Sequence, residues 1–265
     1  MGVKTMIPGT REDWSRWLTE RAGEIKTSIL FSTRLPFAGA APISGSELAK
    51  SIWALPLAGV VIAVIAAAVY ALAHRVGLPP WPVAALTVSA TLAVTGCQHE
   101  DGLANTVDGF GGGKTREQKL AIMREARIGT YGVCALALSI LLRTGALAEL
   151  ADTRWVVYAL IAAHAAARAT LPVLMFFMPP ARTDGLSYEA GRPSREQAAT
   201  AAVLGILVLV GCLGFTPALL ASILLVAVIA LMARSTFVQI GGQTGDVLGA
   251  LEQASEIVVL LVALR

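Results

Sequence analysis

Long apolar runs separated by short polar segments dominate the chain after residue 50. A helix rises about 1.5 Å per residue, so about 20 apolar residues cross a hydrocarbon core of about 30 Å. Seven runs come near that length: 52–73, 83–96, 132–150, 155–178, 198–215, 217–233 and 247–264. They lack a period-two alternation of apolar and polar residues. The pattern predicts an all-α fold, a polytopic integral membrane helical bundle of about seven transmembrane helices, with six as the alternative.

Two of these runs are less regular than the others. Run 83–96 is short and spans a bilayer only if its helix continues into the polar segment that follows. Run 247–264 contains Glu252 and Glu256, and carboxylates at membrane depth are costly unless they have a function or a partner.

The composition agrees with a bilayer as the surrounding medium. Apolar residues make up 55% of the 265 positions and the mean hydropathy is +0.68, while only 15% are charged, against about 25% in soluble domains. We expect one membrane-embedded domain over residues 1–265, and a net charge of +3 gives no reason to expect a nucleic-acid partner. Three scattered cysteines without CxxC spacing are expected to be small buried apolar residues: Cys97, Cys134 and Cys212.

Lysine and arginine are distributed unevenly between the two sides of the predicted bundle. Most of the 21 fall in residues 1–50, 98–130 and 179–197, and few, Arg143 among them, are assigned to the opposite side. The positive-inside rule then predicts a multi-pass protein of the bacterial inner membrane with a cytoplasmic N-terminus. Residues 11–30 place Trp14, Trp17 and Leu18 among charged residues, which fits an amphipathic helix on the membrane surface or a plain cytoplasmic helix.

The candidate chemistry lies in an acidic segment directly after run 83–96. Asp101, Asn105 and Asp108 are spaced i, i+4, i+7, so a helix places them on one face near the cytoplasmic interface. Like charges on one face repel unless a cation lies between them, and hard oxygen ligands suit Mg²⁺ or Mn²⁺. We expect such a cation site at Asp101, Asn105 and Asp108, with Mg²⁺ favouring a phosphate-bearing substrate.

Basic and polar residues accompany this segment on the same predicted side. Lys119, Arg124 and Arg127 are expected to bind anionic oxygens. Polar islands at 180–187 and 239–246 are expected to contribute to the same site. Their candidate site residues are Arg182, Asp184, Gln243, Thr244 and Asp246. Within the fourth run, His164 and Arg168 share a helix face, either toward a substrate cavity or as a buried pair with an acidic partner.

Four segments together resemble the cobalamin synthase family, the adenosylcobinamide-GDP ribazoletransferases. They are 31–36 (FSTRLP), 99–109 (HEDGLANTVDG), 127–132 (RIGTYG) and 241–250 (GGQTGDVLGA), in an order that extends over almost the whole chain. The chain departs from the family at Asn105, where the family usually has aspartate, so one negative charge is lost from the acidic segment.

The resemblance implies a Mg²⁺-dependent phosphotransferase. A ribose hydroxyl of α-ribazole, or of its 5′-phosphate, attacks the cobinamide-linked phosphorus of adenosylcobinamide-GDP, and GMP leaves. On this interpretation Asp101, Asp108, Asp184 and Asp246 are catalytic, and Glu100, Asp101, Asn105 and Asp108 ligate the metal. The substrate contacts are Arg34, His99, Lys119, Arg124, Arg127, Tyr131, Arg182, Gln243 and Thr244. Besides the lipid bilayer, a second copy of the chain and other enzymes of late cobalamin synthesis are the expected partners.

Two alternatives remain open on the sequence. A phosphatidyltransferase acting on CDP-activated alcohols uses similar aspartate spacing, although Asn105 stands where its motif has arginine. A membrane transporter or scaffold for corrinoids also explains His164 and Arg168, but it leaves the clustering of acids and bases on one side less well explained.

Overall fold

The computed structural model describes residues 10–36, 42–150 and 152–265, and within these ranges the fold is helical. The predicted N-terminal cytoplasmic segment lies partly outside the described residues, at 1–9 and 37–41. The elements are α1 (Arg11–Ser32), α2 (Gly45–Ser51), η1 (Ile52–Ala54), α3 (Leu55–Arg75), α4 (Pro80–Thr95), α5 (Gln98–Gly112), α6 (Arg116–Ile122), α7 (Thr130–Leu150), α8 (Thr153–Phe177), α9 (Leu186–Ala190), α10 (Arg195–Leu213), α11 (Phe215–Ile240) and α12 (Gly245–Val262). The all-α membrane bundle predicted from the sequence is confirmed.

By length and composition, the described residues contain five or six candidate spanning segments, which includes the alternative of six but not the seven expected. Among the described residues, five helical segments are long and apolar enough to cross a membrane: Gly45–Arg75, Thr130–Leu150, Thr153–Phe177, Arg195–Leu213 and Phe215–Ile240. The pair α4 and α5 makes a sixth only if it is counted as one span, because the chain bends by 90° between them. Helix α12 is not among the helices apolar enough to cross a membrane, because it carries three carboxylates: Asp246, Glu252 and Glu256.

The surface of the bundle is apolar, as a surrounding lipid phase requires. Of the most apolar 18-residue stretch of α8, 78% is buried inside the protein, whereas only 17% of the corresponding stretch of α11 is buried. Helix α8 is therefore central and α11 peripheral. Leucine and valine side chains along α7, α10 and α11 are largely exposed. The same outward packing explains why Cys134 on α7 is exposed and Cys212 is only half-buried, contrary to expectation.

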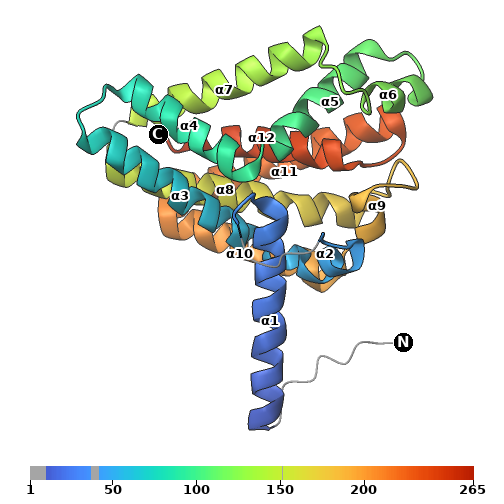
Figure 1. The fold of residues 1–265 in the computed structure, drawn as a ribbon, viewed down its shortest axis with the longest axis horizontal. Coiled ribbons are helices and arrows are strands. Elements are labelled where there is room, and N and C mark those ends of the chain that lie inside the picture. Colours follow the sequence, from blue (N-terminus) through green and yellow to red (C-terminus); the bar gives the residue numbers. More distant parts are fainter. Residues whose placement is uncertain (1–9, 37–41, 151) are drawn as a thin grey trace.

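Helix α8 lies between α3, α10 and α12 and packs through small residues. A Cβ on Gly59 of α3 would lie 2.3 Å from the carbonyl oxygen of His164, so the two helices touch through their backbones. The C-terminus of the chain lies at the end of the bundle where α3 leads into α4, away from α6 and α9 (Figure 1).

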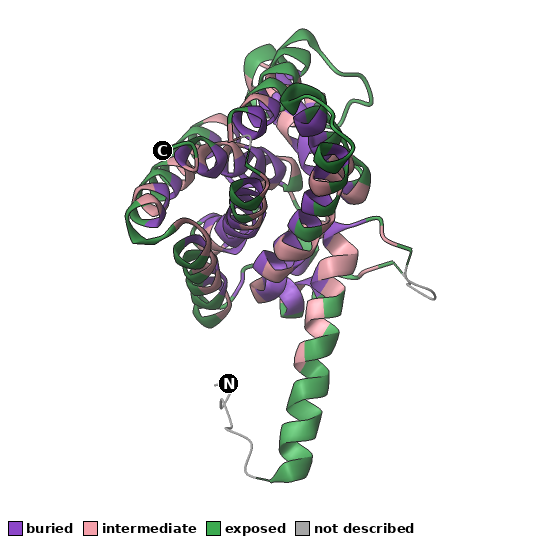
Figure 2. Ribbon diagram, turned by 90° about the vertical axis from the view of Figure 1, so that its left-hand side faces the viewer, coloured by how far each residue is buried: buried purple, intermediate pink, exposed green. Residues whose placement is uncertain are grey.

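Helix α1 runs across the direction of the bundle helices and projects beyond them (Figure 1). Its C-terminal half is attached to the bundle: the Ser28 hydroxyl donates to the carbonyl of Ser51 (2.6 Å), and the Trp53 indole donates to Glu24 (2.6 Å). Its N-terminal half is exposed along its length (Figure 2), including Trp14 and Leu18.

Candidate functional site

A sharp bend between α4 and α5 sets the direction of the acidic helix. Gly96 and Cys97 both adopt left-handed backbone conformations, with φ of 65° and 57°. The Arg34 side chain lies directly over Gly96, where a Cβ would come within 2.7 Å of its Nε, and the Arg34 N–H donates to the carbonyl of Val94 (2.7 Å). Because the bend turns the chain here, run 83–96 does not continue straight into the polar segment. Cys97 is exposed at this bend and was wrongly expected to be buried.

Two glycines bring α5 against the beginning of α12. A Cβ on Gly102 would lie 2.7 Å from the carbonyl oxygen of Asp246, and one on Gly249 would lie 3.1 Å from the Cα of Gly102. The helices can approach this closely because neither residue has a side chain at the crossing. The consequence is that Asp101 and Asp246, far apart in sequence, face one region.

The side-chain amide of Asn105 joins these two carboxylates. Its Nδ2 donates to Oδ2 of Asp101 (3.0 Å) and to Oδ1 of Asp246 (3.2 Å). The assignment of nitrogen and oxygen follows from the hydrogen bonds, since only the NH₂ end can satisfy two carboxylates at once. Rotation of this amide by 180° would instead present an oxygen between two carboxylates, a donor set that suits a hard divalent cation.

The two polar islands meet beside this group. Residues 179–181 and Gln243 pair as a short parallel β-bridge, with the Ala181 N–H donating to the Gln243 carbonyl (2.7 Å). The bridge places Arg182 so that its Nη2 donates to Oδ2 of Asp246 (2.7 Å). Thr244 is buried and accepts a hydrogen bond from the N–H of Val247 (3.3 Å), which caps α12. Gln243 is also buried, so the side chains of Gln243 and Thr244 support the structure of the site beneath its surface.

A pocket of about 270 Å³ opens in front of these residues. Asp101, Arg182, Asp184 and Asp246 line one part of it, with His99 and Gln98 from the first turn of α5. Apolar side chains from α1, α2, η1, α3 and α8 line the rest. The pocket therefore combines carboxylates and a guanidinium with an apolar wall.

Asp108, expected to share a cation with Asp101, has a different environment. Its two carboxylate oxygens accept hydrogen bonds from the N–H groups of Gly129 (2.7 Å) and Gly132 (2.8 Å), at the start of α7. A Cβ on either glycine would lie within 2.5 Å of a carboxylate oxygen. The carboxylate therefore fixes the N-terminus of α7, where backbone donors lack partners within the helix. Asp101, Asn105 and Asp108 lie on one helix as expected, but the Asp108 carboxylate is engaged by the start of α7 and not by Asn105.

Glu100, the other expected metal ligand, points into the bundle. It accepts hydrogen bonds from Nη2 of Arg143 (3.0 Å) and Nε2 of Gln253 (3.1 Å). Arg143, assigned above to the side opposite the cytoplasm, is instead buried in the middle of α7 and also pairs with Glu256 (3.4 Å). Both carboxylates thus neutralise an intramembrane arginine, which explains their position at membrane depth.

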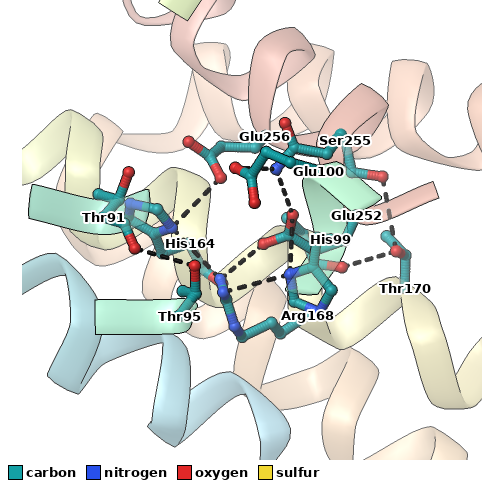
Figure 3. A network of polar contacts seen from close by, with 12 residues as sticks. Thr91, Thr95, His99, Glu100, His164, Arg168, Thr170, Glu252, Ser255 and Glu256 are labelled. Carbon is teal, nitrogen blue, oxygen red and sulfur yellow. Dashed lines mark hydrogen bonds and ion pairs between the residues drawn. The ribbon is translucent and has the colours of Figure 1, made fainter. Parts of the chain in front are cut away.

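The buried charges form one network behind the pocket (Figure 3). Arg168 pairs with Glu252 (2.7 Å), and His164 lies 3.3 Å from Glu256, which confirms the expected acidic partners of His164 and Arg168. His99 Nδ1 lies 3.2 Å from Glu252 and connects the network to the pocket. Potential ligand atoms of His164, Glu252 and Glu256 lie within 4.8 Å of one another, but Arg143 and Arg168 already supply positive charge to these carboxylates.

Sequence reasoning missed three members of this network. In the sequence, Glu252 and Glu256 only made run 247–264 less regular as a spanning helix, and Gln253 was not singled out. Their i, i+1 and i+4 spacing on one helix, opposite two intramembrane arginines, is the signal that would have indicated buried pairing.

The expected basic contacts lie in and directly after α6 and are largely engaged with the protein itself. The Lys119 amine donates to Gln239, and Arg124 binds the carboxylate of Asp184. Arg127 is exposed, and Tyr131 is exposed with its ring against Gly111. Of these residues, only Asp184 lines the pocket, so Arg124 reaches the site through its ion pair.

An all-α bundle with an outward apolar surface, and with carboxylates, an amide and a guanidinium converging on a pocket at one side, defines an integral-membrane protein with a pocket that is polar on one side and apolar on the other. The chain belongs to the cobalamin-5-phosphate synthase family, whose model matches residues 24–264.

Relatives agree over nearly the whole chain. An adenosylcobinamide-GDP ribazoletransferase of Bradyrhizobium diazoefficiens is 48% identical over 258 residues, covering 97% of each chain. Proteins with the same name from Mesorhizobium japonicum (50% identity; 91% of this chain and 92% of the relative) and Azorhizobium caulinodans (42%; 90% and 94%) are also similar. No solved structure matches the chain.

Proposed function

We propose that this protein joins α-ribazole, or α-ribazole 5′-phosphate, to adenosylcobinamide-GDP with release of GMP. Membership of the family and the names of its relatives support this reaction. The observation that carries it is the meeting of Asp101 and Asp246, bridged by Asn105, beside Arg182 in one pocket. Displacement at a diphosphate needs such a group, because its main requirements are charge neutralisation and positioning.

The reaction forms one bond and breaks one. The ribose oxygen bonds to the cobinamide-linked phosphorus, and the bond from that phosphorus to the bridging oxygen breaks, so GMP leaves with the electron pair. Arg182 donates to non-bridging oxygens of the diphosphate. Asp184, which lines the pocket and is exposed at its rim, accepts the hydroxyl proton.

Asp101 and Asp246 are the residues that would hold Mg²⁺, with the Asn105 amide turned to present its oxygen. Their fit rests on two carboxylates that both lie within 3.2 Å of one amide nitrogen, a position that already concentrates negative charge. When bound, Mg²⁺ neutralises the diphosphate and orients it for in-line displacement. Glu100 and Asp108 are left out of this set: Glu100 points into the bundle, where its Oε1 binds Arg143, and both oxygens of Asp108 bind the start of α7.

The pocket opens toward the side of the bundle that carries most of the positive charge, which supports the bacterial inner membrane with a cytoplasmic N-terminus as the location. Helix α1 runs across the spanning helices and is therefore proposed to lie along the cytoplasmic leaflet. Its tryptophans suit the headgroup layer, where amphipathic rings are favoured.

The direct test uses purified protein in lipid with adenosylcobinamide-GDP, α-ribazole and Mg²⁺, and follows GMP by chromatography. GMP is expected in amounts equal to the corrinoid product, and none is expected when α-ribazole is omitted. GMP release that does not depend on α-ribazole would mean hydrolysis rather than transfer. Movement of corrinoid across a sealed vesicle without GMP would favour a transporter.

A further inference from the structure

The pocket has an apolar wall that the phosphate chemistry does not use. Eight side chains form it, and they come from parts of the chain far apart in sequence: Phe31, Leu48, Ile52, Leu55, Leu171, Met175, Leu186 and Leu248. Five of the eight are at most 4% exposed, so the wall is rigidly packed. These residues belong to one hydrophobic cluster, which encloses this end of the bundle.

The polar groups gather on the other part of the pocket, formed by α5, the loop after α8 and the start of α12. A ligand that fills the pocket must therefore be apolar at one end and bear its reacting oxygen or phosphate at the other. Its apolar end must also lack hydrogen-bonding edges, since the wall's side chains carry no group to pair with them.

The size of the pocket and the apolar character of its wall distinguish between the two substrates of the proposed reaction. A pocket of about 270 Å³ admits a molecule of nucleoside size and is too small for a corrin macrocycle. Guanosine diphosphate brings a base with several polar edges, which would be left unpaired against the wall. The aryl base of α-ribazole is uncharged, flat and largely apolar, and its ribose carries the attacking hydroxyl.

We propose that the apolar wall binds the aromatic base of the acceptor nucleoside and so directs its ribose toward Asp101 and Asp246. Met175 is the central contact, because a thioether adapts to and attracts an aromatic ring. The inference rests on the proposed function for the identity of the ligand, but it concerns a separate part of the pocket.

Equilibrium binding of α-ribazole alone, measured by dialysis against the protein in lipid, tests the inference without any need for turnover. Met175→Gln keeps the length of the side chain and adds a polar amide to the wall. Affinity for α-ribazole is expected to fall roughly tenfold or more. The matched control is Met178→Gln: Met178 is buried in the same cluster, outside the pocket lining, and its variant should bind like the wild type.

A second variant, Leu186→Ser, covers the case in which Met175→Gln does not fold. Leu186 is half-buried at the rim in the short helix α9, so its replacement disturbs the core less. It too should weaken α-ribazole binding.

Kinetics then assign the ligand. The KM for α-ribazole should rise in both variants, while the KM for adenosylcobinamide-GDP changes less than twofold. The wild type should also have a lower KM for dimethylbenzimidazole riboside than for adenine riboside. In Met175→Gln the difference between these two KM values should be smaller. Unchanged α-ribazole binding in both variants, or a rise confined to the KM for adenosylcobinamide-GDP, would overturn the inference. Wild-type protein that binds α-ribazole at the wall but releases no GMP would refute the proposed reaction and leave the inference standing.

Discussion

The amide nitrogen of Asn105 lies 3.2 Å from Oδ1 of Asp246, although 141 positions separate the two residues. The same nitrogen reaches Asp101, so one neutral side chain holds two carboxylates together at the crossing of α5 and α12. Most members of the family are expected to have aspartate at this position. In this chain, asparagine lets the two helices pack with hydrogen bonds where a third carboxylate would repel.

Asn105→Asp is therefore expected to change stability and Mg²⁺ affinity in opposite senses. Without Mg²⁺ the variant should be less stable by about 1–3 kcal/mol, because hydrogen bonds to charged groups are lost and like charges meet. With Mg²⁺ the added charge should lower the concentration needed for half-maximal activity. Thermal unfolding in EDTA and in Mg²⁺, together with a Mg²⁺ titration of GMP release, measures both effects. A variant equally stable under both conditions would contradict the proposed cation position.

Asp108 provides a contrast with Asp101, because its carboxylate serves the backbone of Gly129 and Gly132. Asp108→Asn should destabilise the fold by about 1–3 kcal/mol, since one oxygen acceptor is replaced by a donor facing N–H groups. The Mg²⁺ concentration for half-maximal activity should stay the same in the protein that remains folded. A shift in that concentration as large as the one caused by Asp101→Asn would make Asp108 a metal ligand after all.

Arg143 should be among the most sensitive positions for stability. It pairs with Glu100 and Glu256 while only 1% exposed, so Arg143→Met leaves two buried carboxylates without their partner. Removing one member of a buried pair costs about 3–5 kcal/mol. Unfolding in detergent, followed by circular dichroism, should show a lower midpoint temperature than in the wild type. Arg154→Met, at an exposed position on α8, is the control and should behave like the wild type.

The position of α1 can be tested by fluorescence. Trp14 and Trp17 are exposed on the protein and should lie among lipid headgroups, so lipids brominated near the glycerol should quench them. The quenching should fall when both are replaced by phenylalanine, and replacing Trp81, at the start of α4, serves as the comparison. Equal quenching in the wild type and the double variant would place α1 in water.

The sequence predicted the membrane class well, because apolar runs of the right length leave few alternatives to spanning helices. The positions of the helix ends and of the bends between helices were harder to predict from the sequence. The turn at Gly96 and Cys97 depends on a left-handed backbone pair and on Arg34 covering it, neither of which hydropathy registers.

Within the site, the sequence predicted that Asp101, Asn105 and Asp246 lie on the same side of the bundle, but not how they meet. A helical repeat predicts neighbours on one helix, so Asp108 was grouped with Asp101. The carboxylate that shares Asn105 with Asp101 is instead Asp246 on α12, brought there by the close approach at Gly102 and Gly249. Contacts of this kind depend on tertiary packing. The same holds for the buried ion pairs of Arg143, which the sequence analysis assigned to the side opposite the cytoplasm.

The proposed role of Asp101 and Asp246 as joint ligands of the cation is tested most directly by Mg²⁺-dependent GMP release from Asp101→Asn, Asp246→Asn and, as a control, Asp152→Asn. Asp152 caps α8 at the opposite end of the bundle, and asparagine preserves a cap. We expect the first two variants to remain in the membrane and to lose activity by about 10²-fold or more even in saturating Mg²⁺, with the control unaffected. Wild-type rates in Asp101→Asn and Asp246→Asn at saturating Mg²⁺ would contradict the account.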